Sequence, residues 1–539
     1  MKLESVTLCS ATLGEDGKRE PPLGPLYIAE TMRRAGLAVD FRDYQLGDEP
    51  TTFEPAKLVS FLRGHSRCIA ISCFVDMLPL VIEAARQLNR DDPSTIIVLG
   101  GPGPTASAAR IVEKYPWIHA VVRGEGEETI VDWLRALQDN GSAPVAGMVR
   151  RCGDVVVDGG ERQRIRDLDE LPPPAYDLLP WSRYSHSRII TTRGCSYRCS
   201  FCDVTALWGN RSVFRSLPKV MQEMELLKSR YGKSQIAIVD DTFVLNRDRV
   251  RQFCNLLIEH RSTVEWGCFG RINLMTPELV ELMRKAGCRA IFYGIDSGSQ
   301  FILDATEKRI KREDIIPCLK WSSEAFQKVE ASFIWGYPFE SHDDFLQTLD
   351  LAAEASVFSP TVNVQLHMLS PLPMSPIYRQ FKGGLLEPEQ EDRPWLLLPP
   401  LLLEERARAL QSYVRDAPEI FPGFFSFPTP HKEAKRELLT RSMRVLDQTI
   451  GATLFDDKLG SLLGLENRKL ERSLLKKAKH PSDRIGLGLA LGLFRRTRRR
   501  ATAQSSCRYY DVSRGRAMKR QRNEELDQTD EQLDRLRGA

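Results

Sequence analysis

The chain has 539 residues, 42% hydrophobic and 27% charged, a length and composition typical of a globular protein with two or three domains. Its formal net charge of +4 is small for this length, so charge gives no reason to expect a nucleic-acid partner. No run of about 18 apolar residues predicts a transmembrane segment, and the first residues lack the apolar stretch of a secretory signal. Twelve cysteines without such a signal argue against a disulfide framework.

Residues 1–144 alternate short apolar runs with amphipathic stretches, which predicts a doubly wound, Rossmann-like α/β domain with a parallel sheet. Strands are predicted at Val6–Cys9, Val39–Arg42, Cys68–Ser72, Ile96–Gly100 and Ala120–Val122. Helices are predicted at Leu26–Arg34, Leu78–Leu88, Ala106–Lys114 and Glu127–Leu137. Ligands of such sheets lie beyond the C-terminal strand ends, where small residues let them approach the backbone. Those at these ends include Ser72, Gly100, Gly101 and Gly124.

The pattern breaks over residues 145–184, where the proline run Leu171–Pro174 predicts a linker. A second alternating series over 185–400 follows, and its six βα repeats are typical of a barrel or partial (β/α)6 barrel with its chemistry at the C-terminal rim. Its predicted strands are Ile189–Thr192, Ile236–Val239, Trp266–Phe269, Ala290–Ile295, Ala331–Ile334 and Thr361–Leu366. Its predicted helices are Pro218–Ser229, Asp248–His260, Pro277–Ala286, Ile315–Ala325 and Asp343–Ala355.

Residues 401–483 are predicted to be helical, most clearly at Leu401–Arg415 and His431–Ile450. The aromatic cluster Phe421–Pro428 is either a cap over a cavity or, as such clusters more often are, plain core. Residues 484–539 are rich in arginine and predict a mobile tail. Its run Arg495–Arg500 favours a solvated tail over a site for nucleic acid, an acidic leader peptide or a membrane surface.

Three cysteines, Cys195, Cys199 and Cys202, come directly after the first strand of the second series. Their spacing brings three thiolates around one loop, enough to hold three irons of a 4Fe–4S cluster and leave the fourth iron open. A structural zinc site is the alternative, but it needs a fourth ligand. The next cysteine in the chain is the distant Cys254, which leaves His186 as the one conceivable candidate.

This C-x3-C-x2-C motif, with Phe201 before its third cysteine, resembles that of the radical S-adenosylmethionine (SAM) superfamily. The resemblance implies that the open iron chelates the methionyl amine and carboxylate of SAM. It further implies that an electron from the cluster cleaves the sulfonium to a 5′-deoxyadenosyl radical. An oxygen-sensitive cytoplasmic enzyme, served by an external electron donor of the flavodoxin or ferredoxin type, is also implied.

Further matches to the superfamily follow the later strands. Val239–Phe243 ends the second strand, where the family has a motif that binds the methionyl amine. The resemblance makes Asp241 the candidate for that contact, and the alternative is a turn residue before a helix that Asn246 caps. Arg271, after the third strand, suits a carboxylate or ribose contact. Gly294–Ser299 resembles the family's Gly-Ile-Glu-Ser-Gly-Ser, with Asp296 one methylene shorter than the family's glutamate. Trp335–Glu340 is similar to the Gly-x-Pro-x-Glu turn near adenine.

Three segments of the first domain resemble the cobalamin-binding domain that precedes many radical SAM enzymes: Pro21–Ala29, Leu99–Gly101 and Val122–Glu127. The resemblance implies a bound cobalamin near Ser72, Gly100, Gly101, Gly124 and Glu125. A domain kept only for packing or substrate binding is the alternative. The Asp-x-His-x-x-Gly motif that ligates cobalt is absent, which implies a base-off cobalamin without a protein histidine on the metal. The stretch Ser72–Phe74 would lie near the lower face of that cofactor, with Cys73 a less favoured cobalt ligand.

Together the motifs resemble those of class B, cobalamin-dependent radical SAM methylases. The resemblance favours methylation of an unactivated carbon or a phosphorus centre, with methylcobalamin as the methyl donor. The same architecture also serves ring-forming enzymes such as the anaerobic Mg-protoporphyrin cyclase, and a non-enzymatic cobalamin or redox sensor is a third reading. The substrate is expected to be a small molecule or a peptide natural product. Gln365, His367 and Tyr378 are the candidate substrate residues.

Overall fold

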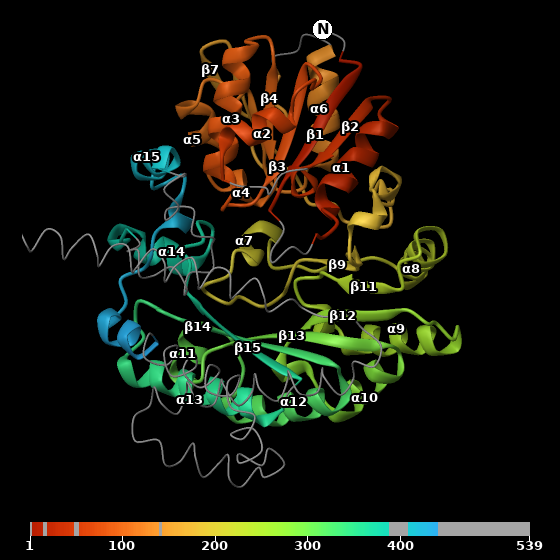
Figure 1. Ribbon diagram of the computed structural model, residues 1–539, viewed down its shortest axis with the longest axis vertical. Helices are drawn as coiled ribbons and strands as arrows, with labels where there is room; N and C mark the ends of the chain where they lie inside the picture. Colours follow the sequence, from red (N-terminus) through yellow and green to blue (C-terminus); the bar gives the residue numbers. More distant parts are fainter. Residues whose placement is uncertain are drawn as a thin grey trace, which may run out of the picture. The chain divides into compact units, whose positions relative to one another are not determined.

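The structure, a computed structural model, describes residues 3–13, 19–47, 53–138, 143–359, 361–387 and 408–439. The described residues form two large β-sheets, one after the other along the chain, and a small two-stranded sheet; helices pack against the large sheets (Figure 1). The predicted tail 484–539, its arginine run and most of the predicted helix His431–Ile450 lie outside the described residues. None of the helices in the described residues combines the length and the apolar character that a membrane span requires.

The first sheet has seven strands in the order β2-β1-β3-β4-β5-β6-β7, and its first five strands are mutually parallel. Its parallel strands are β1 (Ser5–Ala11), β2 (Ala38–Asp43), β3 (Cys68–Cys73), β4 (Ile96–Gly100) and β5 (Ala120–Val122). The helices of this domain are α1 (Leu23–Arg34), α2 (Pro55–Phe61), α3 (Leu78–Asp91), α4 (Pro102–Thr105), α5 (Ala108–Lys114) and α6 (Glu127–Gln138). A separate apolar core fills each face of the sheet, which confirms the predicted doubly wound fold.

The first sheet extends beyond the range predicted for the domain. Strands β6 (Met148–Cys152) and β7 (Val155–Asp158) form an antiparallel hairpin on the edge of β5. The linker prediction is therefore wrong for residues 148–158. These strands are short and β6 carries Arg150 and Arg151, so the strand character arises from pairing with β5 rather than from an apolar pattern of their own.

The second sheet has six parallel strands in the order β8-β11-β12-β13-β14-β15, and β8 does not pair with β15, so the barrel is open. Its strands are β8 (Ser187–Ile189), β11 (Gln235–Ile238), β12 (Glu265–Gly270), β13 (Cys288–Asp296), β14 (Lys328–Trp335) and β15 (Val362–Met368). Its helices are α7 (Val204–Trp208), α8 (Leu217–Tyr231), α9 (Arg247–Glu259), α10 (Pro277–Lys285), α11 (Gln300–Ala305), α12 (Arg312–Ala325), α13 (His342–Phe358) and α14 (Pro376–Phe381). The predicted partial barrel is confirmed.

One predicted strand, Ile189–Thr192, is split in the structure. Its first part is the end of β8, whereas Thr192 belongs to β9 (Thr192–Arg193), which pairs antiparallel with β10 (Val213–Phe214). The buried carboxylate of Asp240 accepts hydrogen bonds from the backbone N–H groups of Thr191 and Thr192, at 2.6 and 3.1 Å. These donors are thereby taken from the sheet, and the chain leaves β8 towards the cysteine loop.

The described part of the C-terminal region packs against both domains. Helix α15 (Arg408–Asp416) lies beside α3, and a further helix covers residues 432–439. Phe421 and Phe424 join an apolar core of the first domain, while Phe427 packs with Tyr337 in the second. The aromatic cluster is therefore core, the second of the two predicted alternatives.

Candidate active site

The cysteine loop begins at a turn that only glycine accommodates. Gly194 has φ +95°, and a Cβ there would lie 2.3 Å from the carbonyl oxygen of Arg211. Cys195 and Cys199 follow as buried residues, and the backbone N–H of Cys202 donates to the carbonyl of Cys199 at 3.1 Å. The three thiols therefore lie on one compact loop at the C-terminal rim of the barrel.

The zinc alternative needs four ligands close to one ion. Among the described residues, no three His, Cys, Asp or Glu side chains converge closely enough to hold one ion. His186, the candidate fourth zinc ligand, lies 2.9 Å from the hydroxyl of Ser185 through Nδ1 and 3.6 Å from the carboxylate of Glu20 through Nε2. A 4Fe–4S cluster instead needs one thiolate on each of three separate irons.

Asp241 lies beside the cysteine loop and helps to hold it. Its Oδ2 accepts a hydrogen bond from the backbone N–H of Gly194 at 2.9 Å, and no hydrogen bond to Oδ1 is found within the described residues. The side chain is open to solvent, yet surrounding protein raises the pKa of its carboxyl by desolvation. The helix α9 behind it is capped by Asn246, which accepts from the N–H of Arg249.

Arg271 is a buried cation next to the cysteines, 5% exposed. Its Nη1 lies 3.8 Å from the sulfur of Cys199, and its guanidinium carbon lies 3.6 Å from the ring centre of Tyr197. Its Nε and Nη2 have no hydrogen-bond partner within the described residues. Since a buried charge is stable only when it is paired, this guanidinium is set up to receive an anion.

Asp296, a predicted cofactor contact, already has a charged partner within the protein, Lys308. Its carboxylate forms a buried ion pair with Lys308, and its backbone has φ +71°. A Cβ on Gly294 would lie 3.3 Å from Oδ1 of Asp296 and 3.3 Å from Nζ of Lys308. Lys308 was not predicted from the sequence, where it stands among the charged residues after α11 without a distinguishing pattern.

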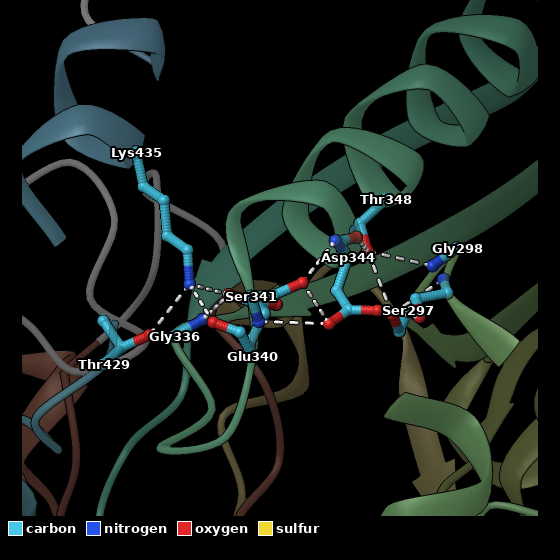
Figure 2. Close-up of polar contacts among 10 residues, drawn as sticks. Ser297, Gly298, Gly336, Glu340, Ser341, Asp344, Thr348, Thr429 and Lys435 are labelled. Carbon is cyan, nitrogen blue, oxygen red and sulfur yellow. Dashed lines mark hydrogen bonds and ion pairs between the residues drawn. The ribbon is translucent and has the colours of Figure 1, made fainter. Parts of the chain in front are cut away.

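A buried polar network joins the two later SAM-like motifs to the C-terminal region (Figure 2). Lys435, on the helix over 432–439, donates to Glu340 Oε2 at 2.9 Å, and both side chains are fully buried. Glu340 Oε2 also accepts from the backbone N–H of Gly336 at 2.9 Å. Lys435 further donates to the carbonyl of Glu340 and to the hydroxyl of Thr429. The Gly-x-Pro-x-Glu turn is therefore held by a lysine from outside the barrel.

The same network continues through the start of α13. Asp344 makes a capping box with Ser341 and accepts from the hydroxyl of Ser299 at 2.5 Å. Thr348 accepts from the backbone N–H of Gly298 at 3.0 Å. Figure 2 shows this chain of contacts running from Lys435 to the segment after β13. The two motif segments therefore form one connected unit.

In the first domain, the predicted cofactor residues meet at the C-terminal edge of the sheet. Ser10 on β1 is in register with Ser72 on β3, which is in register with Gly100 on β4. Gly101 has φ +90°, and a Cβ there would lie 2.8 Å from the carbonyl oxygen of Cys73. The buried hydroxyl oxygens of Ser10 and Thr12 have no partner within the described residues. Small residues and orphaned hydroxyls at one edge suit a polar cofactor.

The neighbouring loop after β5 contains Gly124 and Glu125. Gly124 has φ +66°, and a Cβ there would meet nothing within 4 Å. Both carboxylate oxygens of Glu125 have protein partners: Oε1 accepts from Nη1 of Arg193 and Oε2 from the N–H of Ile165, each at 2.8 Å. Glu125 thus contacts the cysteine loop, a role not predicted from the sequence.

The predicted substrate residues of β15 form a hydrogen-bonded row with β14. Gln365 donates to Glu330 at 2.5 Å, and Nε2 of His367 lies 3.2 Å from Oε1 of Gln365. Desolvation lowers the pKa of His367, which favours its neutral form. Tyr378, on α14, is half-buried, and desolvation raises the pKa of its hydroxyl.

Comparisons with known proteins agree with this geometry. The family model "B12 binding domain" matches residues 10–134, and the model "Radical SAM superfamily" matches residues 189–352. The protein named "Uncharacterized methyltransferase PH0819" from Pyrococcus horikoshii is 28% identical over 347 residues, 63% of this chain and 75% of that protein. The anaerobic magnesium-protoporphyrin IX monomethyl ester cyclase of Cereibacter sphaeroides is 26% identical over 379 residues, 67% of this chain and 60% of that protein.

A solved structure shows the same fold. TsrM from Kitasatospora setae, a radical S-adenosylmethionine methyltransferase solved with cobalamin and a 4Fe–4S cluster, has a TM-score of 0.60 at 17% identity. The match covers 79% of this chain and 88% of TsrM. With a B12-binding domain ahead of a radical SAM domain, the chain belongs to the cobalamin-dependent radical SAM enzymes, whose cofactors are a 4Fe–4S cluster, S-adenosylmethionine and cobalamin.

Proposed function

We propose that the protein is a methyltransferase that methylates an unactivated carbon or a phosphorus centre of a small molecule or peptide. The observation that carries the proposal is the contact between the two cofactor loops: Arg193, next to the cysteine motif, binds Glu125 and Glu127 of the B12-binding domain. When bound, the cluster supplies the electron that cleaves SAM, and the cobalamin carries the methyl group to be transferred. The chain itself binds and orients these groups.

In the radical SAM domain, Cys195, Cys199 and Cys202 are the proposed cluster ligands. The proposed partner of the methionyl ammonium is Asp241, because its Oδ1 accepts no hydrogen bond within the described residues and a partly desolvated carboxylate is stabilised by a cation. For Arg271, a carboxylate would satisfy the two nitrogens that have no partner within the described residues. Asp296 is left with a supporting role, because Lys308 already neutralises it.

In the first domain, Ser72, Gly100, Gly101 and Gly124 are the proposed cobalamin contacts. Both histidines of this domain have hydrogen-bond partners within the protein, which supports the proposal that no protein histidine ligates the cobalt. Nδ1 of His65 lies 2.8 Å from the carbonyl oxygen of Ser66. His119 accepts from the backbone N–H of Ile97, and desolvation lowers its pKa.

A second candidate function is cyclisation, since a cyclase is among the similar proteins. Product mass separates the two: a methylated product gains one methyl group, whereas a ring closure of the cyclase type loses hydrogen. SAM with a deuterated methyl group gives the sharper comparison, because the label appears in the product only in the first case. Gln365 and His367 are the proposed substrate contacts in either case.

The first experiment is anaerobic purification with cobalamin supplied, followed by iron, sulfide and cobalt analysis. We expect about four irons and one cobalamin per chain. Cys199→Ala is expected to lose the iron and keep the cobalamin. Cys254→Ala, a fully buried cysteine away from the loop, is the matched control that keeps both. Iron without cobalamin would contradict the methyltransferase proposal, and zinc in place of iron would contradict both functions.

A further inference from the structure

Arg193 is enclosed by both domains at the point where their cofactor loops meet. Its Nη1 donates to Glu125 at 2.8 Å and its Nη2 donates to Glu127 at 2.6 Å. Its guanidinium carbon lies 5.4 Å from the ring centre of Tyr27 on α1 and 5.9 Å from that of Trp208 on α7. The side chains of the arginine and of both glutamates are 6–7% exposed.

Breaking the contact of either glutamate with Arg193 costs free energy. Removing one partner from a buried ion pair leaves an uncompensated charge in a region with little access to water. Each carboxylate also takes a separate nitrogen of the guanidinium, so the arrangement needs the planar fork of an arginine. Arg164, from the segment between the domains, donates to the backbone carbonyl of Arg193 at 3.2 Å and encloses it further.

The contact is coupled to the cysteines by a short, stiff stretch of backbone. Arg193 precedes Cys195 by two residues, and the residue between them is the sterically restricted Gly194. The N–H of Gly194 is held by Asp241, while Arg193 itself is paired in β9 with Val213. On the other side, Glu125 directly follows Gly124, and Glu127 is the first residue of α6. Arg193 is therefore connected to the cysteine loop through its backbone and to the loop after β5 through its ion pairs.

We infer that Arg193 is a positioning residue that, through Glu125 and Glu127, sets the spacing between the cysteine loop and the cobalamin-side loop. We name these three residues the interdomain triad. The part of the inference that concerns cofactor spacing rests on the proposed function. The coupling of the two loops concerns the protein alone and is tested without any cofactor.

The first test is amide hydrogen exchange on the full chain without cofactors. In Arg193→Met we expect exchange to rise about tenfold or more in both loops, 124–128 and 193–199. Arg193→Lys, which keeps the charge but cannot bridge both carboxylates in the same way, is expected to fall between this variant and the parent. Arg123→Met is the matched control: Arg123 precedes the same loop but pairs with Asp158 inside the first domain, so residues 193–199 should exchange as in the parent.

Parent-like exchange in Arg193→Met, or a change confined to residues 193–199, would overturn the inference, since Arg193 would then act only on its own loop. Should Arg193→Met fail to fold, Arg193→Lys and Glu125→Gln carry the same comparison. Glu125→Gln reaches the triad from the other domain, so it is expected to raise exchange in residues 193–199 as well. No change there would count against the inference.

The second test measures the spin–spin interaction between the paramagnetic forms of the two cofactors in reconstituted protein. We expect Arg193→Met to keep its iron and cobalamin but to show a weaker interaction, with Arg193→Lys between it and the parent. A parent-like interaction would overturn the claim on spacing. If the parent itself binds no cobalamin, the proposed function fails, whereas the exchange experiment still reports on the triad.

Discussion

Replacing Lys435 with methionine tests how the Gly-x-Pro-x-Glu turn is held. The lysine and Glu340 are both fully buried, and among the described residues only Gly336 donates another hydrogen bond to the carboxylate. The second oxygen of Glu340 has no hydrogen-bond partner within the described residues. Removing the lysine therefore leaves a nearly unsolvated charge, and such losses cost about 3–5 kcal/mol of unfolding free energy.

The loss should depend on pH in a defined direction. Desolvation raises the pKa of Glu340, and Lys435 opposes that effect. Without the lysine, the carboxyl pKa in the folded protein rises further above its unfolded value. A raised pKa favours folding at pH values below the unfolded pKa, and this benefit is lost as pH rises through the folded pKa. The variant should therefore be closer to the parent at about pH 5 than at about pH 8.

The measurement is urea unfolding followed by tryptophan fluorescence at both pH values. Lys432→Met, on the same helix but less buried, is the matched control and should change stability by about 0.5 kcal/mol or less. The double variant Lys435→Met with Glu340→Gln should recover much of the loss, because it removes the orphaned charge. A loss below about 1 kcal/mol in Lys435→Met, or a loss that does not shrink on acidification, would refute the reasoning.

Two further predictions concern cofactor binding. Arg271→Met should keep its iron but bind SAM about 10–100-fold more weakly, because a charge-assisted contact is removed; titration calorimetry measures this, with the exposed Arg251→Met as control. Unchanged SAM affinity would count against Arg271 as a carboxylate site. Gly101→Ala should lower cobalamin content and thermal stability more than Gly36→Ala, since both glycines have positive φ but only the first clashes with backbone atoms. Equal effects would show that the close approach at Gly101 is unimportant.

The sequence alone determined the features that depend on short-range patterns. Alternating apolar runs and amphipathic stretches predict both parallel sheets, because strand and helix periodicity is local. The cysteine motif is equally local, since its ligands lie within eight residues of one loop. Short elements escaped prediction, among them α2, α4 and the β6–β7 hairpin, because their conformation follows from the surface on which they pack.

Only the tertiary structure decided how charged residues pair. Arg193 meets Glu125 across 68 positions of sequence, and Lys435 meets Glu340 across 95. The sequence does not show whether a charged side chain is surrounded by solvent or paired with a distant carboxylate. Its partner is chosen when packing buries it, since a charge removed from water must then find an opposite charge. For that reason the cofactor motifs can be recognised in the sequence, while the contacts that hold them together cannot.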